Sequence, residues 1–237
     1  MENDMAGEYS DNLKTTDDED VRRELCLFAA RLKQRGLTSA TGGNISYRVG
    51  DDMWISPTGC VLDELEIDDW VKVNLLTGEA YPHKLKPSSE IVLHREVFLT
   101  RPDVLSIMHS HPPHVIALSL LGIEIQPLGS EAPMTLGDRI PLIPYEIPTS
   151  PMLGKIVAQY ARDYNVMVLE NHGLVVLGKS NREAYNRTEL TEEIAKIMTI
   201  AYSLGKSEPH FPSQEQIKEY KDWYYHKKLP HRLQSPP

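Results

Sequence analysis

The chain has little of what marks several protein classes. Among its 237 residues only two are cysteines, and aromatic side chains make up 7%. Cys26 lies in an apolar helical pattern and Cys60 follows a Gly turn, so neither position indicates a disulfide framework or a Cys-x-x-Cys metal site. This cysteine usage is typical of a reducing compartment.

Long apolar runs and concentrated basic charge are also missing. No stretch of about eighteen apolar residues could form a transmembrane helix, and no secretory signal pattern opens the chain. Lys and Arg are scattered and form no basic stripe interleaved with aromatics, which argues against nucleic acid as a partner. We therefore expect a cytoplasmic protein without a membrane or nucleic-acid partner.

The negative charge lies mostly at the start of the chain. The net charge is −9, and the first twenty residues contribute −7 of it, because they hold eight acidic residues and one lysine. So polar a segment cannot bury enough apolar surface to offset its ordering entropy. We expect residues 1–20 to be a disordered acidic tail, and residues 21–237 to form one domain with a flexible C-terminal tail.

Hydrophobic periodicity and turn residues predict alternating helices and strands. Apolar residues recur at helical spacing over residues 21–36, and a strand pair is predicted on either side of Gly50-Asp51. Further helices are predicted over 91–101, 113–122, 150–164 and 181–206, and further strands over 70–82, 104–111, 140–145 and 165–180. This order predicts an α/β protein with a largely antiparallel sheet covered by helices on both faces.

The stretch "SIMHSHPPH" at 106–114 places His109 and His111 one residue apart after an apolar run. Residues i and i+2 of a strand point to the same face, so the two imidazoles project together if the strand continues through Ser110. A His-x-His pair can form half of a metal site. It can equally be a polar strand end, and the pair alone does not decide between these.

Two further residues extend the pattern. His172 stands in "LENHGLVV", at a turn between two apolar strands, and Glu90 in "KPSSEIVLH" falls in the first turn of a predicted helix. Three imidazoles with a fourth position left exchangeable make the ligand set of a catalytic zinc site. Alternatively, His172 is merely tolerated in its turn, and Glu90 completes a capping box after a Ser N-cap.

Three short loops could hold an anion. "TGGN" at 41–44, "PTG" at 57–59 and "PSS" at 87–89 offer backbone N–H groups, hydroxyls and, in the third case, a helix N-terminus. Each loop alone is an ordinary turn, and none carries a dinucleotide-binding or Walker fingerprint.

Taken in order, these motifs resemble the class II aldolase and adducin-head family. The resemblance runs from about residue 22 to about residue 205, and it rests on "TGGNIS", "ISPTG", "KPSSE", "RPDVLSIMHSHPPHVIALS" and "ENHGLVVLG". It implies a three-layer α/β/α domain with a central, largely antiparallel sheet. It also implies a homotetramer with active sites between neighbouring subunits.

The resemblance also implies roles for particular residues. It makes His109, His111 and His172 ligands of Zn²⁺, or of another divalent cation such as Mn²⁺ or Co²⁺. Glu90 would bind the metal when substrate is absent and transfer a proton when it is present. The positions that grip the substrate phosphate and nearby hydroxyls correspond to Gly43, Asn44, Thr58, Gly59, Ser88 and Ser89.

The chain departs from the fuculose-phosphate aldolases at one functional position. Those enzymes place a tyrosine from the adjacent subunit in the loop that here reads "PLGSEAPMTLGD", where the aligned residue is Ser130. The proton donor to the departing aldehyde must therefore be another group. The candidates are Glu131 and the C-terminal tyrosines Tyr224 and Tyr225, among which the sequence does not choose.

The function implied is that of a zinc-dependent aldolase, which reversibly cleaves a short ketose 1-phosphate to dihydroxyacetone phosphate and an aldehyde. The epimerases of the family usually carry Asp where this chain has Glu90, which favours the aldolases or the related sugar-acid decarboxylases. The alternative is therefore a metal-dependent sugar-acid phosphate decarboxylase or a pentulose-5-phosphate 4-epimerase. A non-catalytic domain like the adducin head is the third reading, and it predicts lost ligands.

Overall fold

A computed structural model describes residues 17–129, 131–205 and 210–223. Seven strands form one sheet in the order β3-β2-β1-β4-β7-β6-β5, and every neighbouring pair is antiparallel except β5 with β6. The strands are β1 (Asn44–Val49), β2 (Asp52–Ile55), β3 (Val71–Asn74), β4 (Ser106–Ser110), β5 (Leu142–Ile143), β6 (Val166–Leu169) and β7 (Gly173–Gly178). The predicted α/β class and the largely antiparallel sheet are confirmed.

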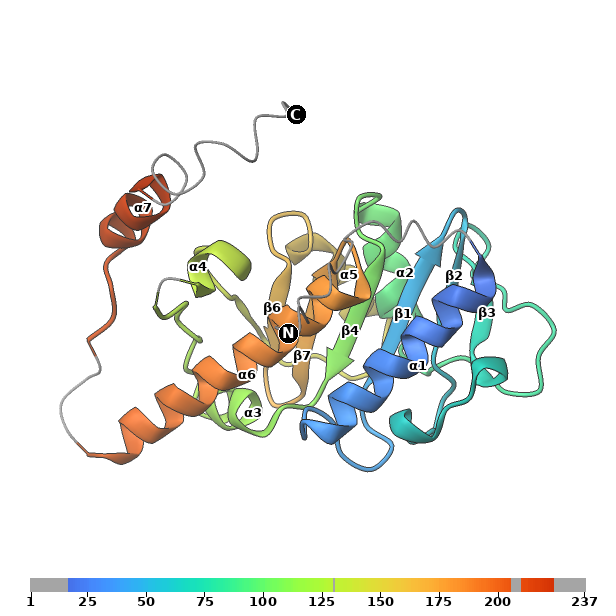
Figure 1. Cartoon of the computed structure of the whole chain (residues 1–237), viewed down its shortest axis with the longest axis horizontal. Coiled ribbons are helices and arrows are strands. Elements are labelled where there is room, and N and C mark those ends of the chain that lie inside the picture. Colours follow the sequence, from blue (N-terminus) through green and yellow to red (C-terminus); the bar gives the residue numbers. More distant parts are fainter. Residues whose placement is uncertain (1–16, 130, 206–209, 224–237) are drawn as a thin grey trace, which may run out of the picture.

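Helices cover both faces of this sheet (Figure 1). The main ones are α1 (Asp18–Gln34), α2 (Ile91–Thr100), α3 (Pro113–Leu120), α5 (Pro151–Tyr160) and α6 (Asn181–Ser203). One apolar cluster joins α1, α3 and α6 to the sheet, and a second joins α2 and α5 to the opposite face. Three layers result, as the resemblance implies.

Strand alternation explains how one sheet contributes side chains to two hydrophobic cores. On β4, Ile107 packs into the cluster of α2 and α5, while Met108 packs into the cluster of α1, α3 and α6. On β7, Val175 and Val176 divide in the same way. Successive residues of a strand point to opposite faces, so a sheet that is covered twice reads as a continuous apolar run.

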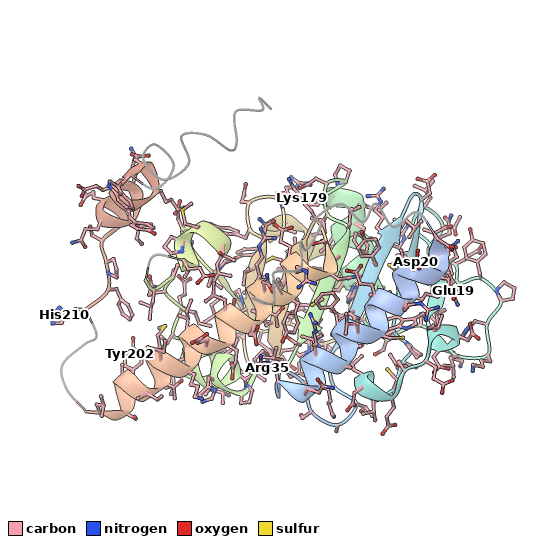
Figure 2. All side chains as sticks on the ribbon, in the orientation of Figure 1. Glu19, Asp20, Arg35, Lys179, Tyr202 and His210 are labelled. Atoms are coloured by element: carbon pink, nitrogen blue, oxygen red, sulfur yellow. The ribbon has the colours of Figure 1, made fainter. Side chains whose placement is uncertain are left out.

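The first helix begins earlier than Val21, the residue expected from apolar periodicity. Asp17 is its N-cap, with a side chain that accepts a hydrogen bond from the N–H of Glu19 at 3.0 Å. Acidic side chains in a first turn face the positive end of the helix dipole, so the acidic run stabilises the helix start. Figure 2 shows Glu19 and Asp20 on the exposed side of this helix.

Several short elements were not predicted. They are the helices α4 (Ala132–Thr135) and α7 (Gln214–Trp223) and the 3₁₀ turns η1 (Leu62–Glu64) and η2 (Ile67–Asp69). Figure 1 shows α7 beside α4. Lys221 of α7 forms an ion pair with Asp138, which follows α4 in the chain. Within the described ranges, no helix is long and apolar enough to cross a membrane.

Candidate metal centre

His109 lies near the end of β4, on the face that packs against α2 and α5. Its side chain is fully buried. The Nδ1–H group of its ring donates to the carbonyl oxygen of Leu174 on β7 at 3.0 Å. A carbonyl oxygen only accepts, so this bond fixes the tautomer of the neutral ring and leaves a lone pair on Nε2.

His111 follows the last residue of β4, and its ring lies beside that of His109. Its Nε2 atom is 3.0 Å from Nε2 of His109, which confirms the predicted pair. Glycines make room for the ring. A Cβ on Gly42 would lie 2.6 Å from Nδ1 of His111, and a Cβ on Gly173 would lie 2.5 Å from the carbonyl oxygen of Ser110. Any larger residue at either position would force the ring or the backbone to move.

His172 comes from the turn between β6 and β7. Asn171, in the left-handed conformation with φ 57°, makes this turn tight, and the N–H of His172 donates to the carbonyl oxygen of Leu169 at 3.1 Å. The ring of His172 lies with its centroid 4.7 Å from that of His109. Its Nε2 atom is 3.6 Å from Oε1 of Glu90.

Glu90 is the N-cap of α2, but its side chain makes no capping hydrogen bond. The capping-box alternative is therefore wrong for this residue. The carboxylate instead turns toward the histidines, with Oε2 at 3.0 Å from Nε2 of His109. The same oxygen accepts a hydrogen bond from the side-chain amide of Asn44 at 2.8 Å. Only 7% of Glu90 is exposed.

Charge and burial set the protonation of this cluster. Burial alone would raise the pKa of Glu90, but the adjacent His109 ring and the hydrogen bond from Asn44 outweigh it and hold the pKa well below its usual range. Burial lowers the pKa of His111 to about 3 and that of His172 to about 4. Neutral imidazoles beside an ionised carboxylate are the forms that bind metals.

The residues fit a divalent cation. His109, His111 and His172 each offer a ring nitrogen, and these atoms all lie within 4.8 Å of one another. Ligands about 2.0–2.1 Å from a tetrahedral zinc ion would be about 3.4 Å apart. Oε1 of Glu90 is buried and has no hydrogen-bond partner among the described residues, a need that a nearby cation would meet.

The three anion-holding loops meet beside this cluster. A single pocket contains Glu90, His111 and His172, and all six predicted substrate-binding residues line it as well: Gly43, Asn44, Thr58, Gly59, Ser88 and Ser89. Backbone hydrogen bonds tie two of the loops together, from Thr58 N–H to Lys86 and from Ser88 N–H to Ser56, both at 3.0 Å. The loops that the sequence separates are therefore one surface in space.

Two residues that line the pocket were not identified from the sequence. Pro148 and Thr149, just before α5, line it too. Thr149 has φ 66°, a conformation that costs a β-branched residue of order 1–3 kcal/mol and that occurs mostly at functional sites. Nothing in the string "EIPTSP" signals this strain.

One candidate proton donor, Glu131, is not among the residues that line this pocket. Glu131 lines a different pocket, against α6, with Thr135, Asn186 and Glu189 among its neighbours. Tyr224 and Tyr225 lie outside the described residues. Their predicted role therefore stays a prediction.

Comparison with known proteins identifies the family. The model of the class II aldolase and adducin N-terminal domain matches residues 23–199. The chain belongs to this family.

Relatives within the class II aldolase family carry two kinds of name. A 3-oxo-tetronate 4-phosphate decarboxylase from Pectobacterium atrosepticum is 33% identical over 205 residues, which cover 84% of this chain and 91% of that protein. An L-fuculose phosphate aldolase from Methanocaldococcus jannaschii is 33% identical over 179 residues, covering 76% of this chain and 96% of that protein. The solved structure of YgbL from Klebsiella pneumoniae, described as a candidate aldolase, epimerase or decarboxylase, is 34% identical. It aligns with a TM-score of 0.77 over 86% of this chain and 98% of that one.

Proposed function

We propose that this protein is a metal-dependent carbon–carbon lyase acting on a small phosphorylated sugar or sugar acid. The observation that carries the proposal is a cluster of three imidazoles, of which His111 and His172 line a pocket that also contains one carboxylate and three anion-holding loops. Membership of the class II aldolase family supports it.

His109, His111 and His172 would hold the metal, for which Zn²⁺ is our first choice and Mn²⁺ or Co²⁺ the alternatives. A divalent cation there would supply Lewis-acid stabilisation of negative charge on substrate oxygens, an effect of several kcal/mol. The hydrogen bond from His109 to Leu174 fixes the orientation of its ring.

Glu90 would carry the proton. Its oxygens differ, because Oε2 is engaged by Asn44 and His109, whereas Oε1 has no hydrogen-bond partner in the described part of the chain. The lowered pKa keeps the carboxyl ionised, so Glu90 must take up a proton from solvent water before it can give one to substrate carbon. Oε1 is therefore the atom that we expect to exchange a proton with substrate carbon.

The loops would bind the substrate phosphate without a full positive charge. No Lys or Arg is among the described residues lining this pocket. Backbone N–H groups around Gly43 and Gly59, the hydroxyls of Ser88 and Ser89, and the N-terminus of α2 supply the partial positive charge. Such a site suits a phosphate ester held at a fixed distance from Glu90.

An aldolase is the first candidate for the reaction. A ketose 1-phosphate would lose the proton of its C4 hydroxyl, and the C3–C4 bond would break to release an aldehyde. The bonding electrons would remain on the other fragment as an enediolate. A proton from Glu90 would then complete dihydroxyacetone phosphate, and the same steps in reverse would make the ketose. This route needs a further group to handle the hydroxyl proton.

A decarboxylase is the second candidate. The relative from Pectobacterium atrosepticum, whose similarity covers more of the chain, carries that name. A 3-oxo-tetronate 4-phosphate would lose CO₂ from C1, leaving its electrons on C2 and C3 as an enediolate. Protonation of C2 gives the same product, dihydroxyacetone phosphate. CO₂ departs without a proton, so the proton that C2 receives must come from solvent water by way of Glu90. Glu90 is the titratable group other than His that lines the pocket in the described ranges, and this route needs no second one.

Both candidates share one step, so a single experiment tests the proposal. Zinc-loaded protein is incubated with dihydroxyacetone phosphate in D₂O, and the hydroxymethyl protons are followed by NMR. We expect one of the two protons to be replaced by deuterium. The His109→Ala variant from a parallel preparation excludes a contaminating isomerase. A metal-loaded protein that leaves both protons in place would overturn the proposal.

The leaving group is then identified with two substrates. The decarboxylase predicts CO₂ release from 3-oxo-tetronate 4-phosphate, and the aldolase predicts condensation of dihydroxyacetone phosphate with short hydroxyaldehydes. Glu131 lines a different pocket of its own chain, so in the homotetramer that the family resemblance implies it would act on a neighbour's pocket. Condensation that depends on Glu131 would support that arrangement.

A further inference from the structure

A chain of buried hydrogen bonds runs from the sheet through α2 to Glu90. Ser46 Oγ lies 2.7 Å from Nδ1 of His94, and Nε2 of His94 lies 2.5 Å from Oδ1 of Asn44. The amide of Asn44 then donates to Oε2 of Glu90 at 2.8 Å. Ser46 and His94 are fully buried, and Asn44 is 6% exposed.

The fold brings these four residues together from distant parts of the sequence. Asn44 pairs with His109 across β1 and β4, and Ser46 pairs with Ile107, so both side chains point to the α2 face of the sheet. On α2, His94 comes four residues after Glu90, so the two side chains are neighbours on the same face of the helix. The row of contacts follows directly from strand register and helical period.

The carboxylate fixes the direction of every bond in the row. An ionised carboxylate only accepts, so the Asn44 amide must present its NH₂ group to Glu90 and its oxygen to His94. That oxygen needs a donor, which requires the hydrogen of neutral His94 to be on Nε2. Nδ1 then accepts from the Ser46 hydroxyl. Each group has a single role, and the amide of Asn44 cannot flip without losing two hydrogen bonds.

We propose that His94 is a positioning residue that holds the Asn44 amide, and through it Oε2 of Glu90, in the orientation needed for proton transfer by Oε1. Asn44 also lines the pocket, so the same restraint acts on a residue that can contact substrate. The consequence for turnover rests on the proposed function, whereas the arrangement of the hydrogen bonds does not.

A pair of matched variants tests the positioning role. His94→Gln keeps an amide N–H near the position of Nε2, from which it can donate to Asn44. His94→Asn keeps an acceptor near the position of Nδ1 for Ser46 but cannot reach Asn44. We expect kcat to fall roughly 10- to 100-fold in His94→Asn and much less in His94→Gln, with KM nearly constant. Metal content should stay equal to that of wild type in both, since the three histidine ligands are intact.

A merely structural role predicts a different result. Both variants would then lose thermal stability, and kcat per metal-loaded chain would be the same in the two. Equal kcat values for His94→Asn and His94→Gln would therefore overturn the positioning role.

A second measurement is independent of activity. Solid-state ¹⁵N NMR of wild-type protein labelled at histidine reports the tautomer of each ring, and the His94 signal is assigned by its absence in His94→Gln. We expect a hydrogen on Nε2 and a bare, hydrogen-bonded Nδ1. A hydrogen on Nδ1 would contradict the inferred row of bonds. If instead the tautomer is as expected and wild-type protein exchanges no proton of dihydroxyacetone phosphate, the proposed function fails and the inferred hydrogen-bond row survives.

Discussion

Glu90→Gln is expected to lower kcat by at least about 100-fold while the protein keeps its metal. Glutamine preserves the size of the side chain and an oxygen that can accept from Asn44, but it cannot exchange a proton with substrate carbon. Loss of a positioned acid–base group typically lowers rates by about 10²- to 10⁴-fold. The three histidines remain to bind the cation.

This prediction is measured by steady-state kinetics together with metal content per chain. Glu96→Gln is the matched control, because Glu96 lies on the same helix and pairs with its neighbour Arg95 rather than with the histidines. The control should retain wild-type turnover. A Glu90→Gln protein with bound metal and full activity would remove Glu90 from the mechanism.

His109→Ala is expected to abolish metal binding and to lower kcat at least about 1,000-fold. His109 is the central member of the set: its ring contacts those of both His111 and His172, and Nε2 faces Glu90. The two remaining imidazoles would bind a divalent cation only weakly. Without the cation, the negative charge that develops on substrate oxygens in the transition state is not stabilised.

Thermal unfolding separates loss of metal from loss of fold. A ligand that binds only the folded state raises the Tm, so a chelator should lower the Tm of wild-type protein and leave that of His109→Ala unchanged. The control is His210→Ala, because His210 is exposed on the segment between α6 and α7 (Figure 2). If His109→Ala still bound one metal per chain and kept its turnover, the ligand assignment would be wrong.

The parts of the site that depend on local pattern could be predicted from the sequence. The two-residue period of a strand was enough to place His109 and His111 together, and β4 ends at Ser110, just before the second ring. The turn that carries His172 was also evident between two apolar runs. In both cases the geometry follows from a few consecutive residues.

The role of Glu90 was harder to predict, because local pattern favoured a different interpretation. A Glu after two serines at a helix start normally reads as a cap. Only the family resemblance pointed to the histidines, and the structure has the carboxylate beside His109 with no capping bond. The role of Glu90 as a metal ligand stays a prediction.

The hydrogen bonds behind Glu90 could not have been predicted without the fold. His94 reads as an ordinary apolar-face residue of a helix, and its partners depend on the register of β1 against β4 and on how α2 packs on the sheet. The strained backbone of Thr149 likewise depends on tertiary packing. Strand register between distant segments and loop conformation are the features that are hardest to predict from a single sequence.

We expect His109, His111 and His172 to bind a catalytic divalent cation beside Glu90. The most direct test is X-ray diffraction at the zinc absorption edge, from crystals of wild-type protein grown with equimolar Zn²⁺. One strong anomalous peak per chain is expected, about 2.0–2.1 Å from a nitrogen of each of the three rings. Crystals with the three histidines ordered and no anomalous peak among them would contradict it.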